Sequence, residues 1–221
     1  MKQIKNILFD YDGTLHNNLK IYIPAFKKAY GYLVEKGYAN HRVWKDDEIS
    51  KWVGYNSKEM WNLFMKDLPD LEKVKCSRII GSEMIHLLNE QKAELYEGTL
   101  EVLGRLKNKG YRLLFLSNCK IEYMNAHRVL FNLDQYFEGF YCTEAFGYKP
   151  KYEIFNRINE TYRGEFIVVG DREVDIEIAL KHNLKSIGCA YGFGRQEELA
   201  HAKHIAYSIE EVETIIERYD C

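Results

Sequence analysis

Hydrophobic positions along the chain follow two different patterns, and the change between them falls near residue 96. Between residues 16 and 96, apolar side chains recur at intervals of three and four residues, as at Phe26, Tyr30 and Leu33. This is the period of amphipathic helices that bury one face. The stretch contains no convincing strand, so we expect it to be helical throughout.

After residue 96, short apolar runs alternate with helical patterns. Residues 111–116 and 165–169 are typical of buried strands, and shorter strands are expected at 140–142, 186–189 and 205–207. Strands that alternate with helices form parallel sheets with helices on both faces. The sequence therefore predicts an α/β fold with a Rossmann-like parallel sheet.

One further strand, Ile7-Leu8-Phe9, precedes the helical stretch. Its partners in a sheet are available only after residue 96, so the helical stretch interrupts one α/β domain. We predict a core made of residues 1–15 and 97–221, and an inserted helical domain made of residues 16–96.

Composition narrows the possible partners and location. The 221 residues carry a net charge of −2, which gives no electrostatic case for nucleic acid or an anionic membrane. No apolar run approaches the roughly 20 residues that span a bilayer, and the first residues form no apolar signal segment. Five scattered cysteines with no CxxC pair favour reduced thiols. We therefore expect a cytoplasmic protein, a monomer or a small homo-oligomer.

Polar residues follow the predicted strands at one end of the sheet. Ligands of parallel sheets bind beyond the carboxyl ends of the strands, so these residues should share one site. Several carboxylates face a single lysine, and this surplus of negative charge favours a hard divalent cation, with Mg²⁺ the best match. The residues are Asp10 and Asp12, Ser117 and Asn118, Lys149, and Asp171 and Asp175.

The order and spacing of four motifs resemble those of haloacid dehalogenase superfamily phosphatases, over nearly the whole chain. With its helical insertion as a cap, the chain is most similar to the phosphoglycolate-phosphatase-like branch. Tyr152 stands where a second proline is common, and further departures at Asn17-Asn18 and Glu97 leave the substrate open. The motifs are Asp10-Tyr11-Asp12-Gly13-Thr14, Leu116-Ser117-Asn118, Lys149-Pro150, and Gly170-Asp171-Arg172-Glu173-Val174-Asp175.

The resemblance implies hydrolysis of a small soluble phosphomonoester through an aspartyl phosphate. Asp10 would be the nucleophile, and Asp12 the acid that protonates the leaving group and later the base that activates water. Thr14 would orient Asp12. Ser117, the backbone amide of Asn118, and Lys149 would bind the phosphoryl oxygens.

The same resemblance implies a site for Mg²⁺. Its ligands would be Asp10, the backbone carbonyl of Asp12, and Asp171, with Asp175 in support. In the inserted domain, Tyr55 and Lys58 are the candidates for contact with the leaving group of the substrate. The alternative for each of these two is an ordinary exposed residue. His16 would either line the cleft or sit in the linker.

Other functions of the superfamily remain open at this point. A dehalogenase needs neither an acid for the leaving group nor a metal, which Asp12 and Asp171 argue against. A phosphomutase would also keep Asp12, and phosphonatase chemistry would need a lysine in the cap, for which Lys58 is the nearest candidate. A non-catalytic phosphate-binding regulatory protein would be expected to lack part of the motif set, and none is missing.

Overall fold

The structure is a computed structural model that describes residues 4–219, so Cys221 lies outside the described residues. The chain forms two compact units. The first contains residues 1–17 and 95–221, and the second contains residues 18–94. Each boundary lies two residues from the predicted one. Among residues 4–219, none of the helices combines the length and apolarity needed to cross a membrane.

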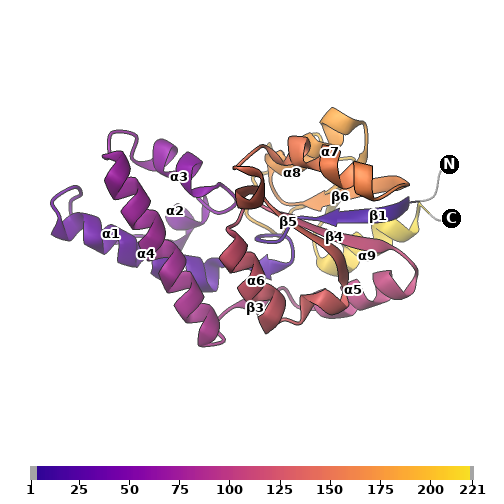
Figure 1. The fold of residues 1–221 in the computed structure, drawn as a ribbon, viewed down its shortest axis with the longest axis horizontal. Helices are drawn as coiled ribbons and strands as arrows, with labels where there is room; N and C mark the ends of the chain where they lie inside the picture. Colours follow the sequence, from indigo (N-terminus) through magenta and orange to yellow (C-terminus); the bar gives the residue numbers. More distant parts are fainter. Residues whose placement is uncertain (1–3, 220–221) are drawn as a thin grey trace. The chain divides into compact units, whose positions relative to one another are not determined.

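The first unit is built on a six-stranded sheet in which every neighbouring pair is parallel (Figure 1). The sheet order is β5-β4-β1-β6-β7-β8, so the strand that opens the chain lies in the middle. The strands are β1 (Ile4–Phe9), β4 (Arg112–Ser117), β5 (Phe137–Cys142), β6 (Glu165–Gly170), β7 (Lys185–Cys189) and β8 (His204–Ala206).

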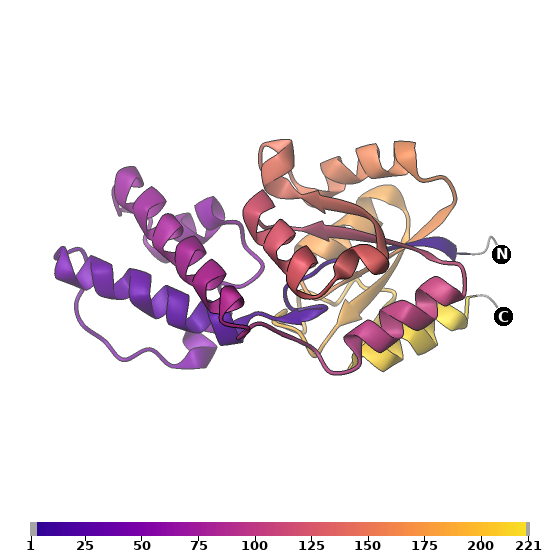
Figure 2. The ribbon, with the colours of Figure 1, turned by 60° about the horizontal axis from the view of Figure 1, so that its bottom comes forward.

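Helices cover both faces of this sheet. On one face α7 packs beside α8, and on the other α5 packs beside α9 (Figures 1 and 2). The predicted Rossmann-like α/β fold is thereby confirmed. The helices of this unit are α5 (Thr99–Asn108), α6 (Ile121–Leu130), α7 (Lys151–Thr161), α8 (Glu173–His182) and α9 (Ile209–Glu217), with 3-10 turns η1 (Leu133–Gln135) and η2 (Thr143–Phe146).

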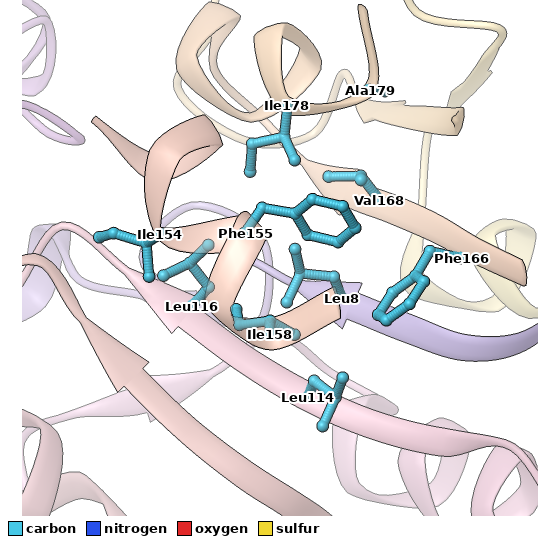
Figure 3. Packing of buried hydrophobic residues seen from close by; sticks show 10 residues of the cluster. All are labelled: Leu8, Leu114, Leu116, Ile154, Phe155, Ile158, Phe166, Val168, Ile178 and Ala179. Carbon is cyan, nitrogen blue, oxygen red and sulfur yellow. The ribbon is translucent and has the colours of Figure 1, made fainter. Parts of the chain in front are cut away.

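A hydrophobic core packs α7 and α8 against the sheet. Ile154, Phe155 and Ile158 of α7 pack onto strands β1, β4 and β6, together with Ile178 and Ala179 of α8 (Figure 3). Burying an aliphatic or aromatic side chain of this size contributes about 1.5–3 kcal/mol. The core therefore holds the first turn of α7 firmly at the carboxyl edge of the sheet.

The second unit is helical, with α1 packed along α4. Its aromatic side chains gather around Phe64, which has Trp44, Trp52 and Trp61 within 5.7 Å between ring centroids. Asn56 caps α3 by accepting the amide of Glu59. Its helices are α1 (Leu19–Glu35), α2 (Asp46–Ser50), α3 (Ser57–Phe64) and α4 (Asp70–Asn89), and short strands β2 (His16–Asn17) and β3 (Glu94–Leu95) pair where the chain passes between the units.

Candidate active site

Asp10 stands at the carboxyl end of the central strand. Phe9 lies in register with Phe115 of β4 on one side and with Val169 of β6 on the other. Asp10 therefore leaves the sheet between the ends of two neighbouring strands, with only 7% of its surface exposed. Residues that follow β4 and β6 reach the same edge.

Three buried carboxylates and one lysine meet there. Asp10, Asp171 and Asp175 each offer an oxygen within 4.8 Å of the others. The Nζ atom of Lys151 donates to Oδ1 of Asp10 at 2.5 Å and to Oδ1 of Asp175 at 2.6 Å. When all are ionised, three negative charges and one positive charge leave a net charge of −2. A divalent cation would balance this charge, and carboxylate oxygens are the ligands that Mg²⁺ takes.

The pKa values of Asp10 and Asp171 reflect the same excess of negative charge. Burial raises the pKa of Asp10 well above its usual range, and the neighbouring charge of Asp175 adds to the increase despite the opposing Lys151. Burial, followed by the charge of Asp175, raises the pKa of Asp171 to about 7. Both aspartates are thus poorly compensated by the protein's own charges.

The backbone around Asp171 is closely packed. Gly13 has a φ of +92°, and a Cβ atom there would lie 2.3 Å from Oδ2 of Asp171, so only glycine fits. The amide of Phe193 donates to Oδ2 of Asp171 at 2.8 Å, and the hydroxyl of Thr14 donates to Oδ1 at 3.3 Å. The turn at Gly13 directs Thr14 towards β6, so the expected contact of Thr14 with Asp12 is replaced by one with Asp171.

Asp12 is oriented by other residues. Its Oδ1 atom lies 2.7 Å from Nδ1 of His16 and accepts the hydroxyl of Tyr123 at 2.8 Å. His16 is fully buried, whereas the side chain of Asp12 is 16% exposed. Asp12 is therefore more accessible than the three carboxylates around Lys151.

Ser117 and Asn118 occupy the end of β4 beside β1, as the strand-end rule predicts. Ser117 is buried and Asn118 is half-buried. They leave the same edge of the sheet as Asp10, the position expected of groups that bind phosphoryl oxygens. Their role in binding stays a prediction.

The lysine beside the carboxylates is Lys151, and Lys149 is exposed. Lys149 precedes Pro150, which caps α7, so it lies in the loop before the helix. Lys151 is the first residue of α7, and its side chain lies on the buried face of that helix. The sequence predicts Lys149 beside these carboxylates, and the structure places Lys151 there instead.

Tyr55 and Lys58 lie in the second unit. Tyr55 is half-buried just before α3, and Lys58 is exposed on the first turn of that helix. Their contact with a substrate stays a prediction. Sequence reasoning missed Lys151, Tyr123 and the amide of Phe193, and left His16 undecided.

Comparisons with known proteins identify the family of this chain. Residues 7–189 match the family model described as haloacid dehalogenase-like hydrolase. The chain belongs to this family. It is therefore a hydrolase, and the resemblance inferred from the four motifs is confirmed.

Individual relatives in the family are distant. The chain is 24% identical to a phosphoglycolate phosphatase of Aliivibrio fischeri over 213 residues, which cover 91% of each chain. It is also 24% identical to the pyrophosphatase PpaX of Bacillus mycoides, over 79% of this chain and 78% of that one. A predicted phosphatase from Clostridium acetobutylicum shares the fold, with a TM-score of 0.83, 23% identity, and coverage of 98% of this chain and 99% of its own.

The raised pKa of Asp171 gives a prediction about stability. Its ordinary pKa is 3.8, and the folded protein raises it to about 7. The protonated form is thus favoured by folding, so this stabilisation is complete below the ordinary pKa and is lost as pH rises through about 7. In the metal-free protein, Asp171→Asn should avoid this loss because asparagine carries no charge. The variant should therefore be more stable than the wild type at about pH 8, by a few kcal/mol.

Thermal unfolding in EDTA at about pH 5.5 and about pH 8 would measure the effect. Asp67→Asn, which removes an exposed carboxylate far from this cluster in sequence, is the matched control and should follow the wild type. Equal losses of stability with pH in the wild type and in Asp171→Asn would contradict the prediction.

Proposed function

We propose that this protein hydrolyses phosphate monoesters of small soluble metabolites, with transient transfer of the phosphoryl group to Asp10. The observation that carries the proposal is the position of Asp10, buried at the end of β1 with Lys151 and two further carboxylates around it. The names of two distant relatives, a phosphoglycolate phosphatase and a pyrophosphatase, support chemistry at phosphorus.

Asp10 acts as the nucleophile. Lys151 binds its Oδ1 atom, so Oδ2 is the oxygen that attacks phosphorus while the ester bond to the leaving oxygen breaks. Lys151 also stabilises the charge on the phosphoryl oxygens, and Ser117 with the amide of Asn118 donates hydrogen bonds to them. Fixed donors of this kind in a water-poor site commonly provide the largest share of the rate.

Asp12 moves the protons. It gives a proton to the leaving alkoxide in the first step and removes one from the hydrolytic water in the second, and each step contributes about 10²–10⁴-fold. Its partial exposure and its separate hydrogen bonds set it apart from the carboxylates around Lys151. Two aspartates one residue apart therefore carry two different roles.

The cluster of Asp10, Asp171 and Asp175 fits a divalent cation, and we propose Mg²⁺. Bound there, Mg²⁺ would neutralise charge on the transferring phosphoryl group. Asp10 and Asp171 would hold it together with the backbone carbonyl of Asp12. Asp175 anchors Lys151 and accepts the amide of Arg172 at 3.1 Å, which fixes the start of α8.

In this proposal the second unit selects the substrate. We propose that residues 18–94 act as a cap in which Tyr55 and Lys58 contact the leaving group. The substrate class is a small phosphorylated metabolite, with phosphoglycolate, pyrophosphate and sugar phosphates as the compounds to test.

Hydrolysis of an aryl phosphate should require Mg²⁺ and fall by at least about 100-fold in EDTA, because the uncompensated charge of −2 repels the phosphate dianion. Release of the phenol, followed by absorbance before and after Mg²⁺ is added back, measures this. The same preparation carrying Asp10→Asn controls for contaminating phosphatases. Full activity in metal-free buffer would contradict the metal requirement, and no activity on any phosphate ester would contradict the function.

A further inference from the structure

A cluster of polar rings lies next to Asp12 within the first unit. His16 follows the first motif, and Tyr123 and His127 come from α6. The rings of His16 and His127 lie 4.5 Å apart between centroids, and those of Tyr123 and His127 lie 4.2 Å apart. All three side chains are buried. Among residues 4–219, this cluster links Asp12 to three ionisable rings, and the reaction described above uses none of them.

Both hydrogen bonds to Asp12 end on the same oxygen. His16 and Tyr123 approach Oδ1, at 2.7 and 2.8 Å. Because Oδ1 accepts both hydrogen bonds, we assign the donor N–H of His16 to Nδ1, which leaves Nε2 as the acceptor of that tautomer. This agrees with the burial of Nε2 without a hydrogen-bond partner among the described residues, since an N–H group there would be a more costly orphan.

We propose that His16 and Tyr123 are positioning residues for Asp12. By holding Oδ1, they fix the rotation of the carboxyl group and present Oδ2 to the leaving oxygen of the substrate. This inference rests on the proposed phosphatase function, and it identifies the oxygen that transfers the proton. The side chain of Asp12 is 16% exposed, and among the described residues these two side chains form the hydrogen bonds to its carboxyl group.

The cluster contains its own control. Tyr11 and His127 form a second buried hydrogen bond, 2.7 Å between Oη and Nδ1, in the same ring cluster. The structure records no hydrogen bond from either side chain to Asp12 within residues 4–219. Tyr11→Phe removes a buried hydroxyl from the cluster just as Tyr123→Phe does, but it leaves both donors of Asp12 in place. A purely structural effect should therefore appear equally in the two variants.

The kinetic test compares an alkyl with an aryl phosphate. The poor alkyl leaving group needs the acid, so Tyr123→Phe and His16→Leu should each lose about 10- to 100-fold on the alkyl ester in the single-turnover rate at which the leaving group is released, the step that uses Asp12 as an acid. On the aryl ester the same variants should lose less, and Tyr11→Phe should keep the wild-type ratio of the two substrates. His16→Asn, whose amide places a donor near the position of Nδ1, should recover most of the alkyl activity. Equal losses on both esters, or equal behaviour of Tyr11→Phe and Tyr123→Phe, would overturn the proposal.

A second measurement does not depend on activity. Nitrogen NMR of the imidazole rings should show His16 with the proton on Nδ1. The Nδ1 signal of His16 should shift in Asp12→Asn and in Tyr123→Phe. It should not shift in Tyr11→Phe, which leaves both hydrogen bonds to Oδ1 of Asp12 in place. A proton on Nε2 would refute the contact even in an active phosphatase. If the NMR result is as expected but the wild type turns over no phosphate ester, the proposed function fails and the catalytic role of the contact fails with it.

Discussion

Lys151→Met should lower kcat for phosphate-ester hydrolysis by about 10²–10³-fold, whereas Lys149→Met should leave it within about threefold of the wild type. Lys151 is buried and contacts Asp10 and Asp175, whereas Lys149 is exposed in the loop before α7. The two variants make the same chemical change two residues apart. Their comparison therefore separates the buried cation from the surface one.

The steady-state rate with an aryl phosphate at saturating Mg²⁺ measures the difference, and circular dichroism shows whether each variant is folded. Lys151→Arg supplies a second variant that keeps the charge but changes its shape, so it should be impaired without losing the fold. A larger loss in Lys149→Met than in Lys151→Met would mean that the loop before α7 rearranges in the working enzyme. Equal and small losses would remove both lysines from the catalytic step.

The burial of Lys151 could have been predicted from the sequence. Lys151, Ile154, Phe155 and Ile158 follow the i, i+3, i+4, i+7 spacing of the buried face of a helix, and all four are buried in α7. A lysine that shares a stripe with three core residues needs a buried partner. The motif pattern directed attention to Lys149 before the proline, but the helical period indicates Lys151.

The sheet and its functional edge could be predicted because they depend on local patterns. Apolar runs mark strands, and a parallel sheet brings the ends of its strands to one edge, so Asp10, Ser117 and Asp171 follow from the sequence alone. The partners of Asp12 do not. Tyr123 lies 111 residues from Asp12, and its contact depends on how α6 is rotated on the sheet.

The loop after β7 illustrates the same limit. The amide of Phe193 reaches Asp171, and the hydroxyl of Tyr191 donates to the backbone carbonyl of Thr14 at 2.8 Å. Neither a backbone amide nor a turn carries a residue type that marks a site. These groups are recognised only once the tertiary fold has placed the loop against the first motif.

Asp10→Asn and Asp12→Asn should both abolish steady-state turnover of an alkyl phosphate, but for different reasons. Asp10→Asn keeps the shape of the side chain and removes the nucleophile, so no phosphorylated protein should form from any substrate. Asp12→Asn keeps the nucleophile with its contact to Lys151 and removes the group that transfers protons. On an alkyl phosphate both variants therefore block the first step, one by removing the nucleophile and the other by removing the acid.

An aryl phosphate reveals that difference. Its leaving group departs without help from an acid, so phosphoryl transfer to Asp10 should still proceed in Asp12→Asn, whereas attack of water on the aspartyl phosphate still needs a base. The phosphorylated protein should then accumulate, and rapid acid quenching with mass spectrometry would detect one added phosphoryl group on the peptide that contains Asp10. Asp10→Asn under the same conditions is the matched control and should show none. An Asp12→Asn protein that forms no adduct and keeps the wild-type turnover would assign proton transfer to a different residue.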